Sequence, residues 1–238
     1  MNVAPGTHLG PYEILAPIGS GGMGEVWRAR DTRLGRDVAI KVLPTSLAEN
    51  AQLRLRLERE AKTISQLNHP HICSLYDVGD GFLVMELLEG ETLADRLARG
   101  PLPVDQLLRF SIEIAGALDR AHRSGVVHRD LKPGNVMITK SGAKLLDFGL
   151  ARPMASLPPA LTGLTEAKPL TAEGTIVGTF QYMAPEQIEG READIRTDIF
   201  AFGALMYEMA TGRRAFDGRS KTSLIAAILD RDPTPMNE

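Results

Sequence analysis

The chain has 238 residues, of which 43% are hydrophobic, so it is long enough for one large or two small globular domains with a packed core. Its 27 basic and 30 acidic residues give a formal charge of -3, which provides no basic field for nucleic acid or an anionic membrane, and we expect neither as a partner. The single cysteine, Cys73, excludes an internal disulfide, and its apolar neighbours suggest a buried thiol in a reducing compartment.

Signals for membrane insertion and export are not found in the sequence. No apolar run approaches the roughly 20 residues of a membrane-spanning helix, and the N-terminus lacks a basic region followed by an apolar one. We therefore expect a cytoplasmic location, although an anchor beyond Glu238 would not be visible in this sequence.

The first predicted element is a strand from Tyr12 to Ile18, which leads into a glycine-rich turn and a second strand at Val26–Ala29. Glycine allows a positive φ and lets backbone N–H groups approach phosphate oxygens without an intervening Cβ. A flexible turn without a ligand fits the pattern about equally well, and a dinucleotide-binding fold would need a helix directly after the turn. The glycines of this turn are Gly19, Gly21 and Gly24.

A third strand is predicted at Val38–Lys41, and it ends in a cation. An amphipathic helix follows, whose apolar residues at helical spacing are Leu53, Leu57, Ala61 and Ile64. Most lysines at strand ends are only solvated, but the presence of Glu60 on this helix favours a functional role for Lys41. Glu58 is the competing carboxylate, and it points to another face of the helix.

Two apolar runs, Ile72–Tyr76 and Phe82–Leu88, predict a hairpin with a turn-rich loop at residues 77–81. The following segment, residues 88–92, marks a connection to a mainly helical remainder.

The helical remainder begins with a long helix predicted for Asp105–Ser124, with Gly125 as the residue that ends it. Its apolar positions are Leu107, Leu108, Ile112, Ala115, Leu118 and Ala121. A strongly apolar helix is predicted for Thr197–Thr211, and a shorter one near Ser223–Asp230.

The segment that carries most of the chemistry contains His128-Arg129-Asp130-Leu131-Lys132-Pro133-Gly134-Asn135 and, twelve residues after Asn135, Asp147-Phe148-Gly149. Two short strands, Val136–Ile138 and Ala143–Leu146, would bring Asn135 and Asp147 together at one end of a hairpin. A carboxylate and an amide oxygen are hard ligands suited to Mg²⁺. Asp130 would lie beside the metal and accept a proton from an incoming hydroxyl.

Between Gly149 and Ala184 the sequence has little regularity and contains four prolines and five threonines. We interpret it as a long loop, of the kind that is usually functional when it occurs in a compact domain.

In this order, the glycine turn, Lys41, the His128–Asn135 segment and Asp147-Phe148-Gly149 resemble the motifs of protein kinases, and Lys132-Pro133 is similar to the Ser/Thr-specific branch. The match extends from about Tyr12 to the end. By this resemblance the chain is identified as a member of the bacterial, eukaryotic-like Ser/Thr protein kinases. It is expected to be C-terminally truncated, because no residue after 231 supplies the arginine that pairs in this family with the glutamate matching Glu186.

The resemblance implies an α+β class, bilobal protein-kinase fold. A small lobe, residues 12–87, would hold an antiparallel sheet with one helix. A larger, mainly helical lobe, residues 88–238, would be incomplete at its end. The nucleotide would bind in the cleft between the lobes, and Asp198 would cap the backbone of the catalytic segment.

The implied activity is transfer of the γ-phosphate of MgATP, with Mn²⁺ as an alternative ion, to Ser or Thr hydroxyls of proteins. Asp130 would orient or deprotonate the hydroxyl, Lys132 would neutralise the γ-phosphate, and Thr179 would bridge these two residues. Asn135 and Asp147 would hold the metal. The residues implied for ATP binding are Gly19, Gly21, Gly24, Val26, Ala39, Lys41 with its partner Glu60, Met85, Glu86, Leu88 and Met137.

The long loop is implied to be an activation segment. A phosphothreonine in it would neutralise Arg129 and order the loop, and Thr171 and Thr175 are the best candidates for autophosphorylation within a transient homodimer. Two alternatives stay open at this point. One is a truncated or catalytically silent kinase-like binding module, and the other is a small-molecule kinase, which the Lys132-Pro133 pair disfavours.

Overall fold

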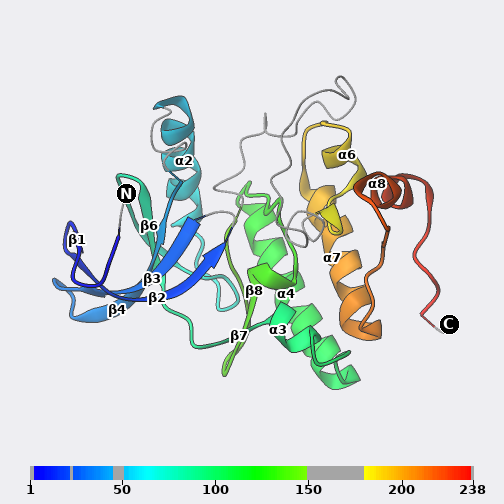
Figure 1. Cartoon of the computed structure of the whole chain (residues 1–238), viewed down its shortest axis with the longest axis horizontal. Coiled ribbons are helices and arrows are strands. Elements are labelled where there is room, and N and C mark those ends of the chain that lie inside the picture. Colours follow the sequence, from blue (N-terminus) through cyan, green and yellow to red (C-terminus); the bar gives the residue numbers. More distant parts are fainter. Residues whose placement is uncertain (1–2, 22–23, 45–50, 149–179, 237–238) are drawn as a thin grey trace. The chain divides into compact units, whose positions relative to one another are not determined.

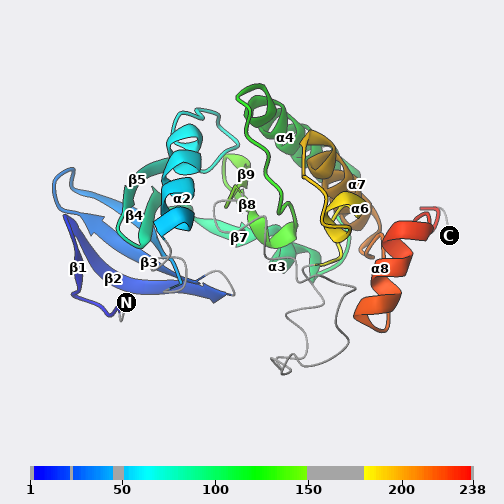
Figure 2. The same cartoon turned by 90° about the horizontal axis from the view of Figure 1, so that it is seen from above.

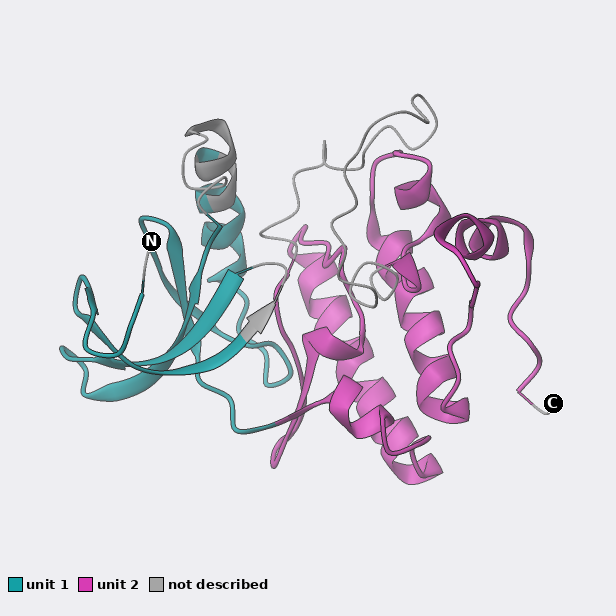
Figure 3. Ribbon diagram, in the orientation of Figure 1, with its two compact units in different colours: residues 1–90 teal, residues 91–238 magenta. Residues whose placement is uncertain are grey.

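The computed structural model describes residues 3–21, 24–44, 51–148 and 180–236 (Figure 1). The chain divides into two compact units, Met1–Gly90 and Glu91–Glu238 (Figure 3). No helix within the described ranges is long and apolar enough to cross a membrane.

The first unit is built on a six-stranded antiparallel sheet with the strand order β1-β2-β3-β4-β6-β5. Its strands are β1 (His8–Leu9), β2 (Tyr12–Gly21), β3 (Gly24–Asp31), β4 (Arg36–Val42), β5 (Leu75–Gly79) and β6 (Phe82–Glu86). One helix, α2 (Ala51–Ile64), lies beside β5, as Figure 2 shows. The helix buries Ala61 and Ile64 of the predicted apolar face, while the side chains of Leu53 and Leu57 lie outside the described part of the structure.

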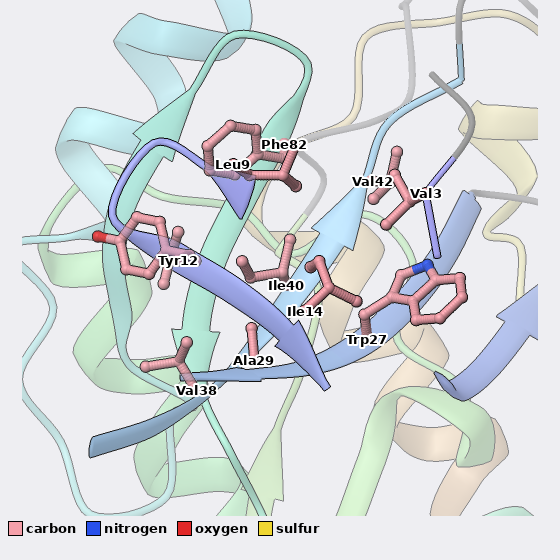
Figure 4. Packing of buried hydrophobic residues seen from close by; sticks show 11 residues of the cluster. Val3, Leu9, Tyr12, Ile14, Trp27, Ala29, Val38, Ile40, Val42 and Phe82 are labelled. Atoms are coloured by element: carbon pink, nitrogen blue, oxygen red, sulfur yellow. The ribbon is translucent and has the colours of Figure 1, made fainter. Parts of the chain in front are cut away.

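The core of this unit forms on one face of the sheet. Its residues occupy alternate positions along β3 and β4, and alternate residues of a strand point to the same face. Trp27 and Ala29 of β3 lie opposite Ile40 and Val38 of β4, and all four contribute to a buried cluster (Figure 4). The other members are Val3, Leu9, Tyr12, Ile14, Val42, Phe82 and Val84. Burying a large aliphatic side chain such as Ile40 contributes roughly 1.5–3 kcal/mol, so this cluster holds the unit together.

The predicted hairpin after α2 is present, but its strands are bounded differently. The first strand continues through Asp77 to Gly79, so that only Asp80 and Gly81 form the turn. Gly81 has φ +83°, a conformation that residues with a Cβ rarely adopt, and this permits the tight turn. Cys73 is half-buried rather than buried, and its thiol lies 3.7 Å from the Glu86 carbonyl oxygen.

The second unit combines helices with a three-stranded sheet of order β7-β8-β9. Its elements are β7 (Gly90–Thr92), α3 (Leu93–Leu97), α4 (Val104–Arg123), η1 (Pro133–Asn135), β8 (Val136–Thr139), β9 (Gly142–Leu145), α6 (Pro185–Ile188), α7 (Ile195–Thr211) and α8 (Lys221–Asp230). The strand β7 was not predicted, because its three residues carry no alternating pattern. Thr92 ends this strand and caps α3 by accepting a hydrogen bond from the Asp95 N–H at 3.1 Å.

The long helix α4 lies side by side with α7 (Figures 1 and 2). It ends as predicted, with Gly125 at φ +73° just after it. The predicted apolar face is partly wrong, since Leu108 and Ile112 are exposed. The helix buries the predicted Leu118 and Ala121 together with Phe110, Ile114 and Ala117, which follow the same spacing on a neighbouring face.

Candidate active site

In the first unit, strand register gathers several predicted ATP-binding residues on one sheet face. Val26 lies opposite Lys41, and Ala39 lies opposite Met85. Cross-strand partners share a face, and these pairs alternate with the core pairs along the strands. Val26, Ala39, Lys41 and Met85 therefore lie on the face turned away from the buried cluster.

Lys41 is the charged residue among these four, and only 5% of it is exposed. An ammonium at such a depth is stable only beside anions or strong hydrogen-bond acceptors. Glu60 of α2, its predicted partner, is half-buried in the same unit.

The glycine turn joins β2 to β3, and Gly21 pairs with Gly24 in the register. Gly24 has φ +115°, and a Cβ there would lie 2.0 Å from the Val42 carbonyl oxygen, so only glycine fits. Gly19 does not have a positive φ, and a Cβ there would meet nothing within 4 Å. Of the positive φ that the sequence allows at these glycines, Gly24 makes use and Gly19 does not. Residues 22 and 23 lie outside the described residues.

The chain after β6 carries the predicted adenine-binding positions. The Glu86 N–H donates to the Ser74 carbonyl oxygen at 2.9 Å, and the Glu86 carboxylate accepts the Ser74 N–H at 3.2 Å. The Glu86 N–H is therefore already used by Ser74. Leu88 is half-buried.

In the second unit, the predicted catalytic residues form a compact hydrogen-bonded group around Asp130. Lys132 Nζ lies 2.8 Å from Asp130 Oδ2, and Asn135 Nδ2 donates to the same oxygen at 3.0 Å. Asn135 Nδ2 also donates to the Asp130 carbonyl oxygen at 2.8 Å. Asp130 and Asn135 are 7% and 6% exposed, so these contacts hold the carboxylate in one orientation.

The predicted hairpin brings Asp147 to this group. Val136 of β8 pairs with Leu145 of β9, and the Leu146 N–H donates to the Asn135 carbonyl oxygen at 2.9 Å. Asp147 follows at once, with φ +51°, a left-handed conformation that is unusual for a residue other than glycine. Met137 lies on β8 and is half-buried.

His128 connects the backbone of Asp130 to the chain just after β9. It is fully buried, its Nε2 lies 2.9 Å from the Leu146 carbonyl oxygen, and its Nδ1 accepts the Asp130 N–H at 3.3 Å. These two contacts require the neutral tautomer with the proton on Nε2. Burial lowers the pKa of His128, against smaller opposite effects of Asp198 and Asp130, and so favours this neutral form.

Asp198 of α7 caps the catalytic segment, as the sequence suggested. Its Oδ2 accepts the His128 N–H and its Oδ1 accepts the Arg129 N–H, both at 2.8 Å. Arg129 has φ +64°, a strained conformation for a residue with a side chain. Gln187 of α6 fixes the other side of this residue by donating to the Arg129 carbonyl oxygen at 2.9 Å.

The structure adds residues that the sequence did not indicate. His122 Nε2 lies 2.7 Å from Asp198 Oδ2. Tyr182 donates a hydrogen bond to the Glu208 carboxylate, and Thr197 donates one to Glu186. These pairs are 11 to 76 residues apart, and only the fold brings them together.

The donor set suits a small hard cation that keeps part of its hydration shell. Asn135 uses its Nδ2 for Asp130, so its amide oxygen is the atom left to meet a cation beside Asp147. Within the described ranges there is no group of three or more His, Cys, Asp or Glu side chains that could hold a metal ion. Mg²⁺ fits this sparse set, because it usually takes one or two carboxylates and completes its shell with water and substrate phosphates.

Three predicted residues cannot be placed. Thr171, Thr175 and Thr179 lie outside the described residues, as does Gly149.

The protein kinase domain family matches residues 12–236 of the chain. The chain belongs to the protein kinase domain family. This kinase domain is 42% identical to the serine/threonine-protein kinase PknD of Mycobacterium tuberculosis over 236 residues, which cover 97% of the chain and 34% of that protein. It is 38% identical to PknB of Mycobacterium leprae over 237 residues, which cover 95% of the chain and 36% of that protein. The chain thus spans about a third of the length of these curated relatives.

A solved structure of the PknI kinase domain from Mycobacterium tuberculosis superposes with a TM-score of 0.72 and 28% identity, covering 96% of this chain and 85% of that one. The kinase domain therefore has the protein-kinase fold, with an antiparallel sheet in its first unit and a mainly helical second unit. Membership of this family implies the use of ATP and a divalent metal ion.

Proposed function

We propose that this chain is an ATP-dependent protein Ser/Thr kinase domain that transfers the γ-phosphate of MgATP to Ser or Thr hydroxyls of proteins. The observation that carries the proposal is the arrangement around Asp130, whose Oδ2 accepts hydrogen bonds from both Lys132 and Asn135. These bonds fix the carboxylate that orients the incoming hydroxyl.

In the proposed reaction, the oxygen of the substrate hydroxyl forms a bond to the γ-phosphorus while the bond from this phosphorus to the bridging oxygen of ADP breaks. Asp130 takes up the proton of the hydroxyl. Lys132 offsets the negative charge on the transferred group, and Thr179 bridges Asp130 and Lys132. Mg²⁺, held by Asn135 and Asp147 with Mn²⁺ as an alternative, neutralises charge on the phosphates when it is bound.

The remaining roles follow the two functional lobes that we assign to residues 12–87 and 88–238. Lys41, paired with Glu60, positions the α- and β-phosphates under a glycine turn formed by Gly19, Gly21 and Gly24. Met85 guards the pocket behind the adenine, and the backbone groups of Glu86 and Leu88 meet its edge. Val26, Ala39 and Met137 hold the purine ring.

We also propose that the domain acts in the cytoplasm and phosphorylates its own activation segment at Thr171 or Thr175 in a transient homodimer. The Arg129 side chain would receive this phosphate. Its backbone is fixed on both sides by Asp198 and Gln187, which supports a role as a preformed anchor.

The test is transfer of radiolabelled γ-phosphate from ATP to a generic Ser/Thr protein substrate by the full chain. Lys41→Met should lower the rate at least about 100-fold, the size expected when a charged group that stabilises the transition state is removed. Lys140→Met is the matched control, because Lys140 is an exposed residue in the turn between β8 and β9. Equal rates for the two variants would contradict the proposal.

A further inference from the structure

A pocket of about 340 Å³ lies in the second unit directly beside the catalytic segment. Lys132, Pro133 and Gly134 form one wall. The other walls come from α3, from the chain just before α6, and from the end of α7 with the residues after it. Because Lys132 Nζ lies 2.8 Å from Asp130, a side chain bound here belongs to a residue near the phosphoacceptor.

Gln181 is the most informative residue of this pocket. It is only 2% exposed, and neither its Nε2 nor its Oε1 has a hydrogen-bond partner. Buried side-chain amides are nearly always hydrogen-bonded, because an unmade bond costs the full desolvation of the group. An amide that lines a pocket with its N–H donors and its acceptor oxygen unused indicates a ligand that supplies both an acceptor and a donor.

The charged groups of the pocket further restrict which ligand side chains can bind. Burial and the adjacent Glu208 raise the pKa of Tyr182, so its hydroxyl stays protonated and donates to the Glu208 carboxylate. Arg214 is exposed at the rim and close enough to Tyr182 to act on this pKa, and no carboxylate of the described chain lies within ion-pair distance of its guanidinium. The pocket thus presents the Glu208 carboxylate and the Arg214 guanidinium as well as the amide of Gln181.

We propose that this pocket binds the side-chain carboxamide of a glutamine or asparagine close to the phosphoacceptor Ser or Thr of the protein substrate. The proposal rests on the proposed kinase function and specifies its substrate class. The ligand oxygen accepts hydrogen bonds from Gln181 Nε2 and the Arg214 guanidinium. The ligand NH₂ group donates to Gln181 Oε1 and the Glu208 carboxylate.

Charged side chains match the pocket less well. A ligand carboxylate would face Glu208 and leave Gln181 Oε1 without a donor. A ligand ammonium or guanidinium would face Arg214 and Lys132 and leave Gln181 Nε2 without an acceptor. Only a group with both a donor and an acceptor satisfies Gln181, Arg214 and Glu208 together.

The experiment uses the full chain and a set of Ser/Thr peptides that are alanine except at one position, which is scanned from four residues before to four residues after the acceptor. Glutamine, asparagine, glutamate and arginine are compared with alanine at each position by kcat/KM. We expect one position at which glutamine or asparagine raises kcat/KM about tenfold, the effect of one or two net hydrogen bonds.

Three variants connect the preference to the pocket. Gln181→Leu should abolish the preference while the all-alanine peptide is still phosphorylated, and it should melt at a higher temperature because a buried unpaired amide is removed. Gln181→Glu should switch the preferred residue to arginine or lysine. Arg214→Ala should weaken the preference, whereas the exposed neighbour provides the control variant Arg213→Ala, which should keep it.

Phosphorylation of all peptides without a position that prefers an amide would overturn this inference and leave the proposed kinase function intact. If Gln181→Leu and Gln181→Glu keep the wild-type preference, this inference is also overturned and the proposed kinase function stays intact. Failure to phosphorylate any peptide would overturn the proposed function and this inference together.

Discussion

His122 Nε2 and Asp198 Oδ2 lie 2.7 Å apart, and this carboxylate also accepts the backbone N–H groups of His128 and Arg129. The fully buried Asp198 thereby ties the end of α4 and the catalytic segment to α7. Asp130 follows directly after the two capped N–H groups. Its position thus depends on residues that touch no substrate.

Asp198→Asn should destabilise the domain by about 2–3 kcal/mol. The amide offers one acceptor oxygen where the carboxylate offers two, so one buried N–H of the catalytic segment is left without a partner. Chemical denaturation monitored by circular dichroism measures the loss. The exposed Asp232 supplies a control, since Asp232→Asn changes charge by the same amount away from this network. A free energy of unfolding equal to that of the control variant would show that the cap does not contribute to stability.

His122 should act as a positioning residue for the transfer step. His122→Leu removes the hydrogen bond to Asp198, and we expect kcat to fall about three- to tenfold with little change in the KM for ATP. His122→Gln places an N–H near the position of Nε2 and should restore most of the loss. If the leucine and glutamine variants have the same kcat, the hydrogen bond is not the cause.

His128 should make the domain less stable in mild acid. A histidine in the unfolded chain takes up a proton below about pH 6.5, whereas burial lowers the pKa of His128 in the folded domain. The unfolded state therefore binds more protons below this pH, and the free energy of unfolding decreases as the pH falls, by at most about 1.4 kcal/mol per pH unit for this proton.

Denaturation at pH 7.5 and at pH 5.5 measures this effect. The carboxyl groups of Asp37, Glu91 and Asp194 have pKa values lowered by hydrogen bonds from arginines, so they stay ionised across this interval and add little to the slope. His128→Phe removes the titrating group, and its stability should depend less on pH than that of the wild type. An unchanged pH slope in this variant would exclude His128 as the source.

Gly24→Ala should be strongly destabilising. The residue has φ +115°, and the new Cβ would lie 2.0 Å from a backbone oxygen of Val42, so strain and displacement together should cost at least about 2 kcal/mol. Gly19→Ala is the matched control, because it has open space and no positive φ. Comparing melting temperatures tests the difference, and similar values for both variants would contradict the geometry of this turn.

Local patterns in the sequence predicted the strands β2 to β6 of the first unit and the helices α2, α4 and α7, because alternation and helical spacing are properties of consecutive residues. They also predicted the hairpin that brings Asn135 to Asp147. The buried face of α4 was partly missed, since two adjacent stripes are both apolar and only the packing partner selects between them. Exposed Ile112 and buried Ile114 show this ambiguity within three residues.

Contacts between distant segments could not be obtained in this way. Tyr182 and Glu208 carry no pattern that connects them, and neither do His122 and Asp198. The unpaired amide of Gln181 is invisible in a sequence, because it depends on which groups fail to reach it. The partners of Asp198 and Glu208 and the unpaired amide of Gln181 are therefore the features that needed the structure.

We propose that Asp130 acts on the substrate hydroxyl and not on ATP binding. The most direct measurement compares the wild type with Asp130→Asn in two readouts, the dissociation constant for MgATP and the rate of phosphoryl transfer at saturating ATP. We predict an unchanged dissociation constant and a rate at least about 100-fold lower, the range of general-base contributions. A rate close to that of the wild type in the Asp130→Asn variant would contradict the account.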